Sequence, residues 1–256
     1  MAEPIDSGPR EWDAGTYQRV SVPHEEWAEA VLERLPLRGD ETVLDAGCGT
    51  GRLTRMLVER LPEGRVVGVD GSRAMIAAVR EVLRAQDEAF VADLTQLELD
   101  GPVDAVLSSA VFHWIEDHET LFARMRAALN PGGRFVAQCG GAGNIDQLRE
   151  TTRRLAAREP YAEHLQGAGE PWHYATPEET EARLRAAGFE QVRFWLQPWD
   201  VVPPEPFEFL RTICLGPYLD PLPEDLRRPF VEDTLAAEAE PLRLRYVRLN
   251  IDAVAA

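Results

Sequence analysis

Apolar residues follow two different periods along the first half of the chain. Short apolar runs, typical of buried strands, alternate with longer stretches in which apolar residues recur every three or four positions, as on one face of a helix. The predicted strands span residues 42–47, 65–70, 89–93, 103–111 and 134–140. The predicted helices span residues 24–35, 51–61, 72–85 and 118–129. This alternation predicts an α/β fold with a parallel, doubly wound sheet and helices on both faces.

The pattern changes after residue 140. Helical spacing dominates this half, and two alternating stretches predict strands at 191–202 and 242–254. The predicted helices span residues 145–158, 177–189, 206–216 and 223–240. The proline-rich segment 201–209 is the best candidate for the boundary of a capping segment.

The turn between the first predicted strand and the following helix reads G-C-G-T-G. Gly47, Gly49 and Gly51 remove side chains from this turn, so a ligand can lie directly against the backbone. The helix beyond the turn begins with backbone N–H groups that have no partner inside the helix. We therefore expect this turn to bind a ligand.

An aspartate stands at the end of each of the first three predicted strands, as Asp45, Asp70 and Asp93. In a doubly wound sheet these strand ends adjoin the crevice in which ligands bind. The carboxylate of Asp70 can accept two hydrogen bonds from a ribose diol, and that of Asp93 can accept one from an adenine amino group. The pattern predicts a site for a nucleoside.

Two nucleoside ligands fit such a site. The dinucleotide fingerprint G-x-G-x-x-G requires a third glycine where this chain has Arg52. The carboxylate of Asp45 would repel a pyrophosphate but suits a cation. S-adenosylmethionine (SAM) carries an ammonium, a sulfonium and no phosphate, so it is the favoured ligand. An NAD(P)-binding oxidoreductase is the alternative outside this class, although the chain has no lysine for a Y-x-x-x-K pair.

Composition and charge narrow the choice of mechanism and partner. All 27 basic residues are arginine, which excludes a Schiff-base lysine or a phosphate-loop lysine. The formal net charge of -17 disfavours nucleic acid as a partner. Cys48, Cys139 and Cys214 are too few and too far apart for a disulfide framework or a metal site. We find neither a signal peptide nor an apolar run of the roughly 18 residues that a membrane helix needs, so we expect a cytoplasmic protein without a membrane partner.

Four segments resemble the motifs of class I SAM-dependent methyltransferases. The segments are "VLDAGCGTG" at 43–51, "VVGVDGSRAM" at 66–75, "VADL" at 91–94 and "NPGGRFVA" at 130–137. The resemblance implies a Rossmann-like sheet of seven strands with the last strand antiparallel, and a helical cap. It also implies SAM as the cofactor and S-adenosylhomocysteine as its product.

The same resemblance assigns cofactor contacts. The position of Asp70 binds the ribose hydroxyls, Met75 and Leu94 flank the adenine, and Gly47 and Gly49 lie against the methionine moiety. The full set of expected cofactor-binding residues is Asp45, Gly47, Gly49, Gly51, Asp70, Gly71, Met75, Asp93, Leu94, Ser109, Trp12, Tyr17 and Gln18.

A narrower resemblance joins the chain to the trans-aconitate methyltransferase group, which converts carboxylates of small acids to methyl esters. It rests on the segments 12–20, 108–133 and 218–230. The segment around 112–114 is also similar to insect juvenile hormone acid methyltransferases, and malonyl-carrier-protein methyltransferases share its "HW". The identity of the acceptor therefore stays open.

The expected acceptor site lies beyond the fourth strand. His113 and Trp114 are the candidate catalytic residues, since they follow this strand near the expected position of the methyl group. The candidate residues for binding an acid are His113, Trp114, His173, Tyr174 and Arg211. A carboxylate is ionised at pH 7, so its methylation needs no general base. An aromatic-rich pocket would favour a fatty, terpenoid or aryl acid over a tricarboxylate.

Two alternatives remain within the SAM-binding class. In O-, N- or C-methylation of another metabolite, His113 would be the candidate base. A SAM-binding module without catalysis is the second alternative. We expect a small-molecule partner, no metal, and a monomer or weak homodimer.

The chain is expected to form a single methyltransferase domain over 1–256. Its expected parts are an N-terminal helical segment over the cofactor (1–40), the SAM-binding core (41–140), helices with the sixth strand and a substrate-side insertion (141–202), a helical cap (203–241) and the final strand (242–256).

Overall fold

The computed structural model describes residues 11–20, 23–165, 170 and 172–256. Parts of the expected N-terminal segment (1–10 and 21–22) and of the expected insertion (166–169 and 171) lie outside the described residues. Of the side chains of residues 23–25 nothing is described.

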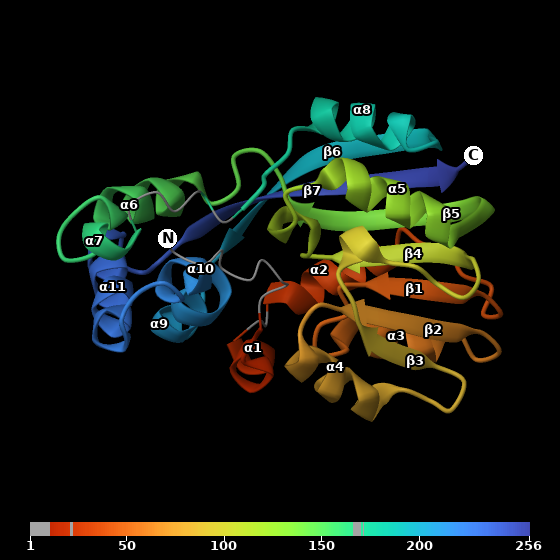
Figure 1. Cartoon of the computed structure of the whole chain (residues 1–256), viewed down its shortest axis with the longest axis horizontal. Coiled ribbons are helices and arrows are strands. Elements are labelled where there is room, and N and C mark those ends of the chain that lie inside the picture. Colours follow the sequence, from red (N-terminus) through yellow and green to blue (C-terminus); the bar gives the residue numbers. More distant parts are fainter. Residues whose placement is uncertain (1–10, 21–22, 166–169, 171) are drawn as a thin grey trace, which may run out of the picture.

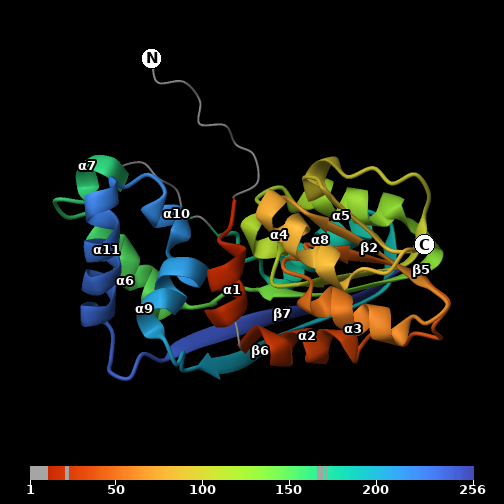
Figure 2. The ribbon, with the colours of Figure 1, turned by 90° about the horizontal axis from the view of Figure 1, so that it is seen from below.

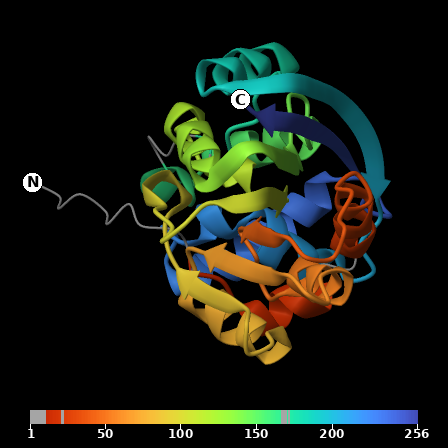
Figure 3. The same cartoon turned by 90° about the vertical axis from the view of Figure 1, so that its right-hand side faces the viewer.

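A seven-stranded sheet forms the centre of the molecule, in the order β3-β2-β1-β4-β5-β7-β6. The strands are β1 (Thr42–Ala46), β2 (Arg65–Asp70), β3 (Glu88–Val91), β4 (Val103–Ser109), β5 (Leu129–Gly140), β6 (Phe189–Val201) and β7 (Leu244–Ala255). The last strand, β7, runs antiparallel to both of its neighbours, and the other paired strands are parallel. The predicted seven-stranded, doubly wound sheet with an antiparallel last strand is confirmed. Figure 3 looks along the strands and shows the twist of this sheet from β3 to β6.

Helices surround the sheet and continue beyond its carboxyl edge. The α-helices are α1 (Ala14–Val20), α2 (Pro23–Leu32), α3 (Arg52–Arg60), α4 (Arg73–Val79), α5 (His118–Ala128), α6 (Asp146–Ala156), α7 (Ala162–Leu165), α8 (Pro177–Ala186), α9 (Pro206–Phe209), α10 (Gly216–Leu219) and α11 (Glu224–Ala237). Shorter helical turns are η1 (Arg80–Val82), η2 (Leu94–Gln96), η3 (Phe112–Trp114) and the π-turn η4 (Leu210–Cys214).

Neighbouring residues of the parallel strands are buried on opposite faces of the sheet. On β1, Val43 joins a core cluster with α2 and α3, whereas Leu44 joins a different cluster with α5 and α8. Figure 2 shows α2 and α3 below the sheet and α5 and α8 above it. This double coverage explains the continuous apolar runs of these strands, because alternation is needed only where one face meets water.

Several predicted boundaries were wrong, among them the following two. The predicted helix over 72–85 ends as an α-helix at Val79 and tightens into η1, which places Val82 against Gly51. Strand β5 begins at Leu129 instead of residue 134. Leu129 pairs with Val103 before an irregular stretch, and regular pairing with β4 resumes only at Arg134. Residues 130–133 form this irregular stretch, which has a positive φ of 76° at Gly132.

A second packed unit lies beyond the carboxyl ends of the central strands. It consists of α6, α7, α9, η4, α10 and α11, which we call the cap. Figure 1 shows the cap at the left of the sheet, with β6 running toward it and β7 running away from it. Helix α6 packs against α11, so the segment 146–165 belongs with 206–237 in space. Residues of the expected insertion therefore contribute to the cap.

The three cysteines are free and buried. Within the described part of the chain, no group of three or more His, Cys, Asp or Glu side chains is arranged to hold a metal ion. Among the same residues, no helix combines the length and the apolar character needed to cross a membrane.

Candidate active site

The glycine turn between β1 and α3 has three left-handed residues, with φ values of 82° at Gly47, 53° at Gly49 and 90° at Gly51. A Cβ atom on Gly47 would lie 2.2 Å from a methyl group of Val111, and one on Gly51 would lie 2.8 Å from Val79. A Cβ atom on Gly49 would meet no atom within 4 Å. Gly47 and Gly51 therefore permit close packing, whereas Gly49 faces open space in which a ligand can approach the backbone.

Asp45 lies directly behind this turn and is 1% exposed. One carboxylate oxygen accepts a hydrogen bond of 2.6 Å from the hydroxyl of Thr54, and Oδ1 has no partner. Burial raises the pKa of the Asp45 carboxyl to about 7, against the opposing effect of the Thr54 hydrogen bond. An unpartnered buried carboxylate oxygen suits a cationic ligand group, because burial of an unpaired charge is costly.

Asp70 ends β2 beside the same turn. Its Oδ2 accepts from the backbone N–H of Gly49 and its Oδ1 from that of Ser72, both at 2.9 Å. Gly71 contributes a further backbone hydrogen bond to this carboxylate. Burial nevertheless raises the pKa of Asp70. The turn thus fixes the Asp70 carboxylate at the mouth of the ligand loop, and each oxygen retains capacity to accept another hydrogen bond.

A cavity of about 60 Å³ lies over the glycine turn. Its lining comes from α1, α2, the glycine turn with the start of α3, and the end of β4. The lining residues are Tyr17, Ala28, Gly47, Cys48, Gly49, Thr50, Arg52, Leu53, Ser109 and Ala110. Ligand sites usually measure roughly 300–1,000 Å³. Binding of a nucleoside here therefore requires movement of the side chains that close the cavity.

Residues 11–20, which we call the N-terminal segment, close the cavity from outside. Figure 2 shows α1 between the cap and the sheet. The carboxylate of Glu11 accepts from the hydroxyl of Ser72 at 2.6 Å and from the backbone N–H of Ala74 at 2.8 Å, at the beginning of α4. At its other end, the segment pairs Arg19 with Glu205 of the cap side. The N-terminal segment is thus fastened both to the core and to the cap.

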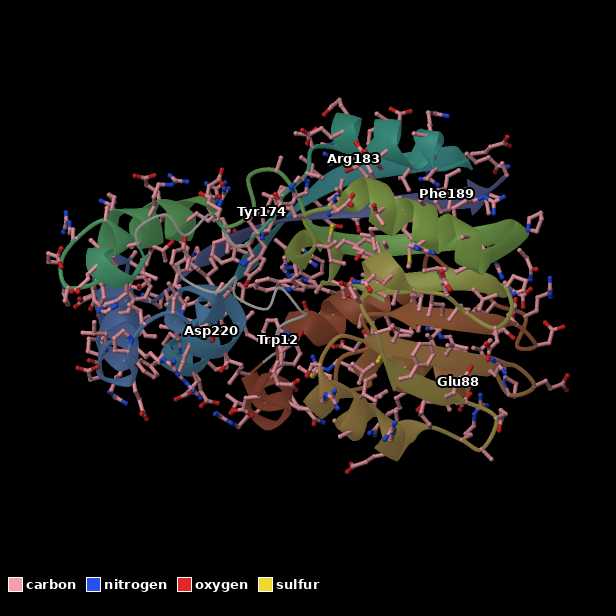
Figure 4. All side chains as sticks on the ribbon, viewed as in Figure 1. Trp12, Glu88, Tyr174, Arg183, Phe189 and Asp220 are labelled. Atoms are coloured by element: carbon pink, nitrogen blue, oxygen red, sulfur yellow. The ribbon has the colours of Figure 1, made fainter. Side chains whose placement is uncertain are left out.

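An aromatic wall separates the cavity from the cap. It consists of side chains from three separate segments, namely Trp12, Tyr17, Trp114, Trp172 and Tyr174. Trp12 contacts Tyr17 and Trp114, with ring centroids 5.7 Å and 5.3 Å apart. Trp172 stacks on Tyr174 at 5.9 Å. Figure 4 shows Trp12 and Tyr174 between the sheet and the cap helices.

His113 adjoins this wall and is 7% exposed. Its ring lies 5.1 Å from that of Trp114 and 5.8 Å from that of Tyr174. Its Nδ1 accepts a hydrogen bond of 3.3 Å from the backbone N–H of Gly140. Because Nδ1 is the acceptor, the proton of the neutral ring is on Nε2.

Arg248, on β7, is a buried cation that the sequence analysis missed. It is 1% exposed, its guanidinium carbon lies 4.2 Å from the ring centroid of Trp27, and its Nε donates to Gln138 at 3.4 Å. Its Nη2 has no partner, and no carboxylate among the described residues is within ion-pair distance of it. Burial lowers the pKa of this guanidinium, and the tyrosines at 17, 174 and 246 interact with its charge. Among the described residues, this buried positive charge beside the aromatic wall therefore has no matching anion.

The structure brings most, but not all, of the sequence-predicted site residues together. Gly47, Gly49, Ser109 and Tyr17 line the cavity, and Trp12, His113, Trp114 and Tyr174 lie around it. Asp45, Asp70, Gly71 and Gly51 shape the glycine turn from behind.

Several predicted residues lie elsewhere or have other partners. His173 turns its ring toward His118, at 4.5 Å, and toward Arg183. Arg211 pairs with Glu208 at 2.8 Å, and its side chain is 43% exposed.

The remaining predicted cofactor residues serve the fold as well. The side chain of Gln18 is exposed, and its backbone carbonyl accepts from Arg52. Asp93 accepts from the backbone and hydroxyl of Thr95 at the start of η2, and Met75 and Leu94 are buried in the structure.

Comparison with known proteins agrees with this arrangement. A family model described as a methyltransferase domain matches residues 43–133. A trans-aconitate 2-methyltransferase from Azoarcus sp. (strain BH72) is 34% identical over 223 residues, which cover 84% of either chain. One from Methylobacterium nodulans is 32% identical over 244 residues, which cover 90% of either chain.

Solved structures share the fold at low identity. Phosphoethanolamine N-methyltransferase 2 of Haemonchus contortus, in complex with SAM, aligns with a TM-score of 0.62 and 19% identity, covering 94% of this chain and 56% of that one. Magnesium protoporphyrin IX methyltransferase of Synechocystis PCC 6803, with bound S-adenosylhomocysteine, aligns with a TM-score of 0.57 and 16% identity, covering 100% of this chain and 90% of that one.

The fold and the glycine-turn site define a SAM-dependent methyltransferase, with SAM as its cofactor. Within this class, the chain belongs to the family that contains the trans-aconitate 2-methyltransferases. The alternative of an NAD(P)-binding oxidoreductase is thereby set aside. The residues present also fit the cofactor, because Asp45 has an unpartnered oxygen for a cation and Gly49 leaves open space at the turn.

Proposed function

We propose that this methyltransferase converts a carboxylate group of a small molecule to its methyl ester. The observation that carries the proposal is Arg248, a buried guanidinium whose Nη2 has no partner and whose charge no described carboxylate offsets. A guanidinium binds a carboxylate through two parallel hydrogen bonds, and this geometry favours arginine at acid-binding sites. Relatives of the chain that are named trans-aconitate 2-methyltransferase support an acid as the acceptor.

The cofactor contacts follow from the geometry of the glycine turn. Asp70 would accept hydrogen bonds from the ribose hydroxyls, and the unpartnered Oδ1 of Asp45 would face the ammonium group. Gly49 would allow the methionine moiety to lie against the backbone. The N-terminal segment would close over the cofactor, with Tyr17 in the lining of the cavity.

The bound cofactor supplies an electrophilic methyl group on its sulfonium. The residues of the chain then have to hold the acceptor in line, neutralise it and exclude water. The oxygen of an ionised acid that would accept this methyl group carries no proton, so no residue of the chain would have to act as a base. Arg248 would hold the acid, and the aromatic wall would keep water out.

The protonation of His113 also supports an acid over an alcohol or amine as acceptor. The backbone N–H of Gly140 occupies Nδ1, so the neutral ring carries its proton on Nε2. With its proton on Nε2 and Nδ1 occupied, the neutral ring has no nitrogen ready to remove a proton. An alcohol needs proton removal during methylation, whereas a carboxylate does not.

Transfer of a labelled methyl group from SAM tests the proposal. Each carboxylic acid in a panel is assayed beside its own primary alcohol, so that the two acceptors differ only in the reacting group. We expect at least about 100-fold faster transfer to the acid, since one general acid–base contribution is worth roughly 10²–10⁴-fold. The product label should be released by mild base, as expected for an ester. Base-stable label on the alcohols would contradict the proposal.

The affinity for SAM should depend on pH through Asp45. Its pKa of about 7 means that, below pH 7, a growing fraction of the ligand-free protein holds this carboxyl protonated. The apparent Kd for SAM should therefore rise about tenfold for each pH unit below 7 and level off above it, until the amino group of the ligand loses its proton near pH ~7.7–8.0. Titration calorimetry from pH 5.5 to 8 measures this dependence.

The variant Asp45→Asn provides the control, since it should bind SAM more weakly and with no pH dependence below 7. The contribution of Asp45 to the free energy of unfolding should depend on pH in the opposite direction. The contribution of a carboxyl with a raised folded-state pKa is complete below its ordinary value of 3.8 and is lost as the pH rises through about 7. A pH dependence of SAM affinity that survives in Asp45→Asn would remove this residue from the ammonium site.

A further inference from the structure

The acceptor site combines one uncompensated cation with a large aromatic surface. We propose that the acceptor is a monocarboxylic acid with a flat apolar body, in contrast to the tricarboxylic acid that names the relatives of this chain. The inference rests on the proposed carboxyl methylation and narrows its substrate. Three independent observations carry it, namely the pairing of the nearby arginines, the aromatic wall and the internal partners of its polar atoms.

Arginines on the cap side of the site are paired with carboxylates. Arg149 lies over the ring of Tyr174, at 5.2 Å, but pairs with Asp146 at 2.7 Å and also with Glu170. On the cap side of the N-terminal segment, the cations at 19 and 211 pair with Glu205 and Glu208. Arg52 belongs to the cofactor cavity and donates to the carbonyl of Gln18.

A second or third carboxylate on the acceptor would therefore meet acidic side chains or aromatic rings at this site. Among the described residues, no carboxylate pairs with Arg248, the buried cation beside the wall. A buried ion without a partner loses its hydration and gains nothing in return. The net charge of -17 adds a further unfavourable field for a trianion.

The aromatic wall offers surface for an apolar body. Trp172 and Tyr174 stack with an angle of 7° between their planes, and Trp172 also lies 6.4 Å from Trp114 and 5.9 Å from Tyr218. Apolar and aromatic groups gain from contact with such rings both by burial and by offset or edge-to-face packing.

Two tyrosine hydroxyls at this surface have partners within the protein. The hydroxyl of Tyr174 is hydrogen-bonded to Asn144, whose Oδ1 in turn accepts from the backbone of Val247 at 2.8 Å. The hydroxyl of Tyr218 is hydrogen-bonded to Thr152. With these hydroxyls engaged, the wall presents mainly apolar surface to the acceptor. The carboxylate of the acceptor would then bind to Arg248.

Three acids that share a trans double bond separate charge from apolar size. They are cinnamate, with one carboxylate and a phenyl ring, crotonate, with one carboxylate and a methyl group, and trans-aconitate, with three carboxylates. With full-length protein and methyl-labelled SAM, we expect kcat/KM to be at least 100-fold higher for cinnamate than for trans-aconitate, and at least tenfold higher for cinnamate than for crotonate.

The outcomes distinguish this inference from the proposed function. Preference for trans-aconitate, with base-labile label, would overturn the monocarboxylate inference and leave carboxyl methylation standing. Absence of ester from all acids, while SAM still raises the melting temperature, would remove the proposed function and this inference together.

A charge variant tests the pairing argument directly. Glu170→Gln removes a carboxylate that offsets Arg149 and should raise kcat/KM for trans-aconitate at least fivefold, with little change for cinnamate. Glu150→Gln removes the same charge from an exposed ion pair with Arg153 on the same helix, and should change neither acid. An equal response of both acids to Glu170→Gln would contradict the argument from charge.

Discussion

Replacing Arg248 with glutamine is expected to lower kcat/KM for the acid about 100-fold or more, while the melting temperature stays unchanged or rises. Truncating one partner of a buried charge pair costs roughly 2–5 kcal/mol, and every 1.4 kcal/mol is tenfold. No carboxylate of the described residues pairs with this guanidinium, and its Nη2 has no partner among them. The substitution removes an unpaired buried charge, which stabilises the fold. This gain in stability offsets the stability lost with the Trp27 contact. Steady-state kinetics of the variant check the expected loss of kcat/KM, and thermal unfolding of the same preparations checks the melting temperature.

Arg34→Gln provides the matched control for this prediction. Arg34 is also largely buried, but it pairs at 2.6 Å with Asp252, which lies on the same strand as Arg248, β7. Its loss would leave Asp252 without its cation, so this variant should lose stability and retain kcat/KM. If Arg248→Gln instead lost stability and kept its activity, the guanidinium would be a structural residue and the acid would bind elsewhere.

Alanine at Gly49 is expected to weaken SAM binding by at least tenfold with a small loss of stability. A Cβ atom at this position enters open space beside the turn, where the cofactor would lie against the backbone. The positive φ of 53° adds a backbone cost of roughly 1 kcal/mol, which lowers the melting temperature by about 2–4 °C for a chain of this size. Calorimetric titration with SAM and thermal unfolding separate these two effects.

Alanine at Gly47 is the contrasting case within the same turn. Its Cβ atom would lie 2.2 Å from Val111, so the turn or the η3 segment must shift even without ligand. We expect a much larger loss of stability than at Gly49, by roughly 2–4 kcal/mol, because overpacking adds to the strain of the left-handed backbone. Normal SAM affinity in Gly49→Ala would show that the cofactor does not approach this residue closely.

The sequence predicts the sheet well because its signals are local. Parallel strands such as β1 and β2 are covered on both faces, so each appears as an uninterrupted apolar run. The glycine turn and the aspartates that follow these strands are likewise fixed by short stretches of chain. Boundaries were less accurate where tertiary packing decides them, as at η1, where the chain tightens so that Val82 meets Gly51.

The acid-binding candidate could not be found in the same way. On β7, Tyr246, Arg248, Asn250 and Asp252 alternate with apolar residues, a pattern typical of a strand with one face in water. The structure buries most of this polar face under α2 and beside the cap, so Arg248 is desolvated although its local sequence indicates exposure. Likewise, Glu11 is 61 residues from Ser72, and only the folded chain shows that it caps α4.

The position of β7 within the sheet has a consequence for the order of folding. β7 is the last strand in the chain but pairs between β5 and β6. During synthesis, β6 therefore has no neighbour in the sheet until β7 has left the ribosome, whereas β1 to β5 can already pair. Such late, long-range pairing slows folding and leaves an exposed strand in the interim. The nascent chain should thus complete its cofactor half first, and Arg248 should reach its place only with the strand that closes the sheet.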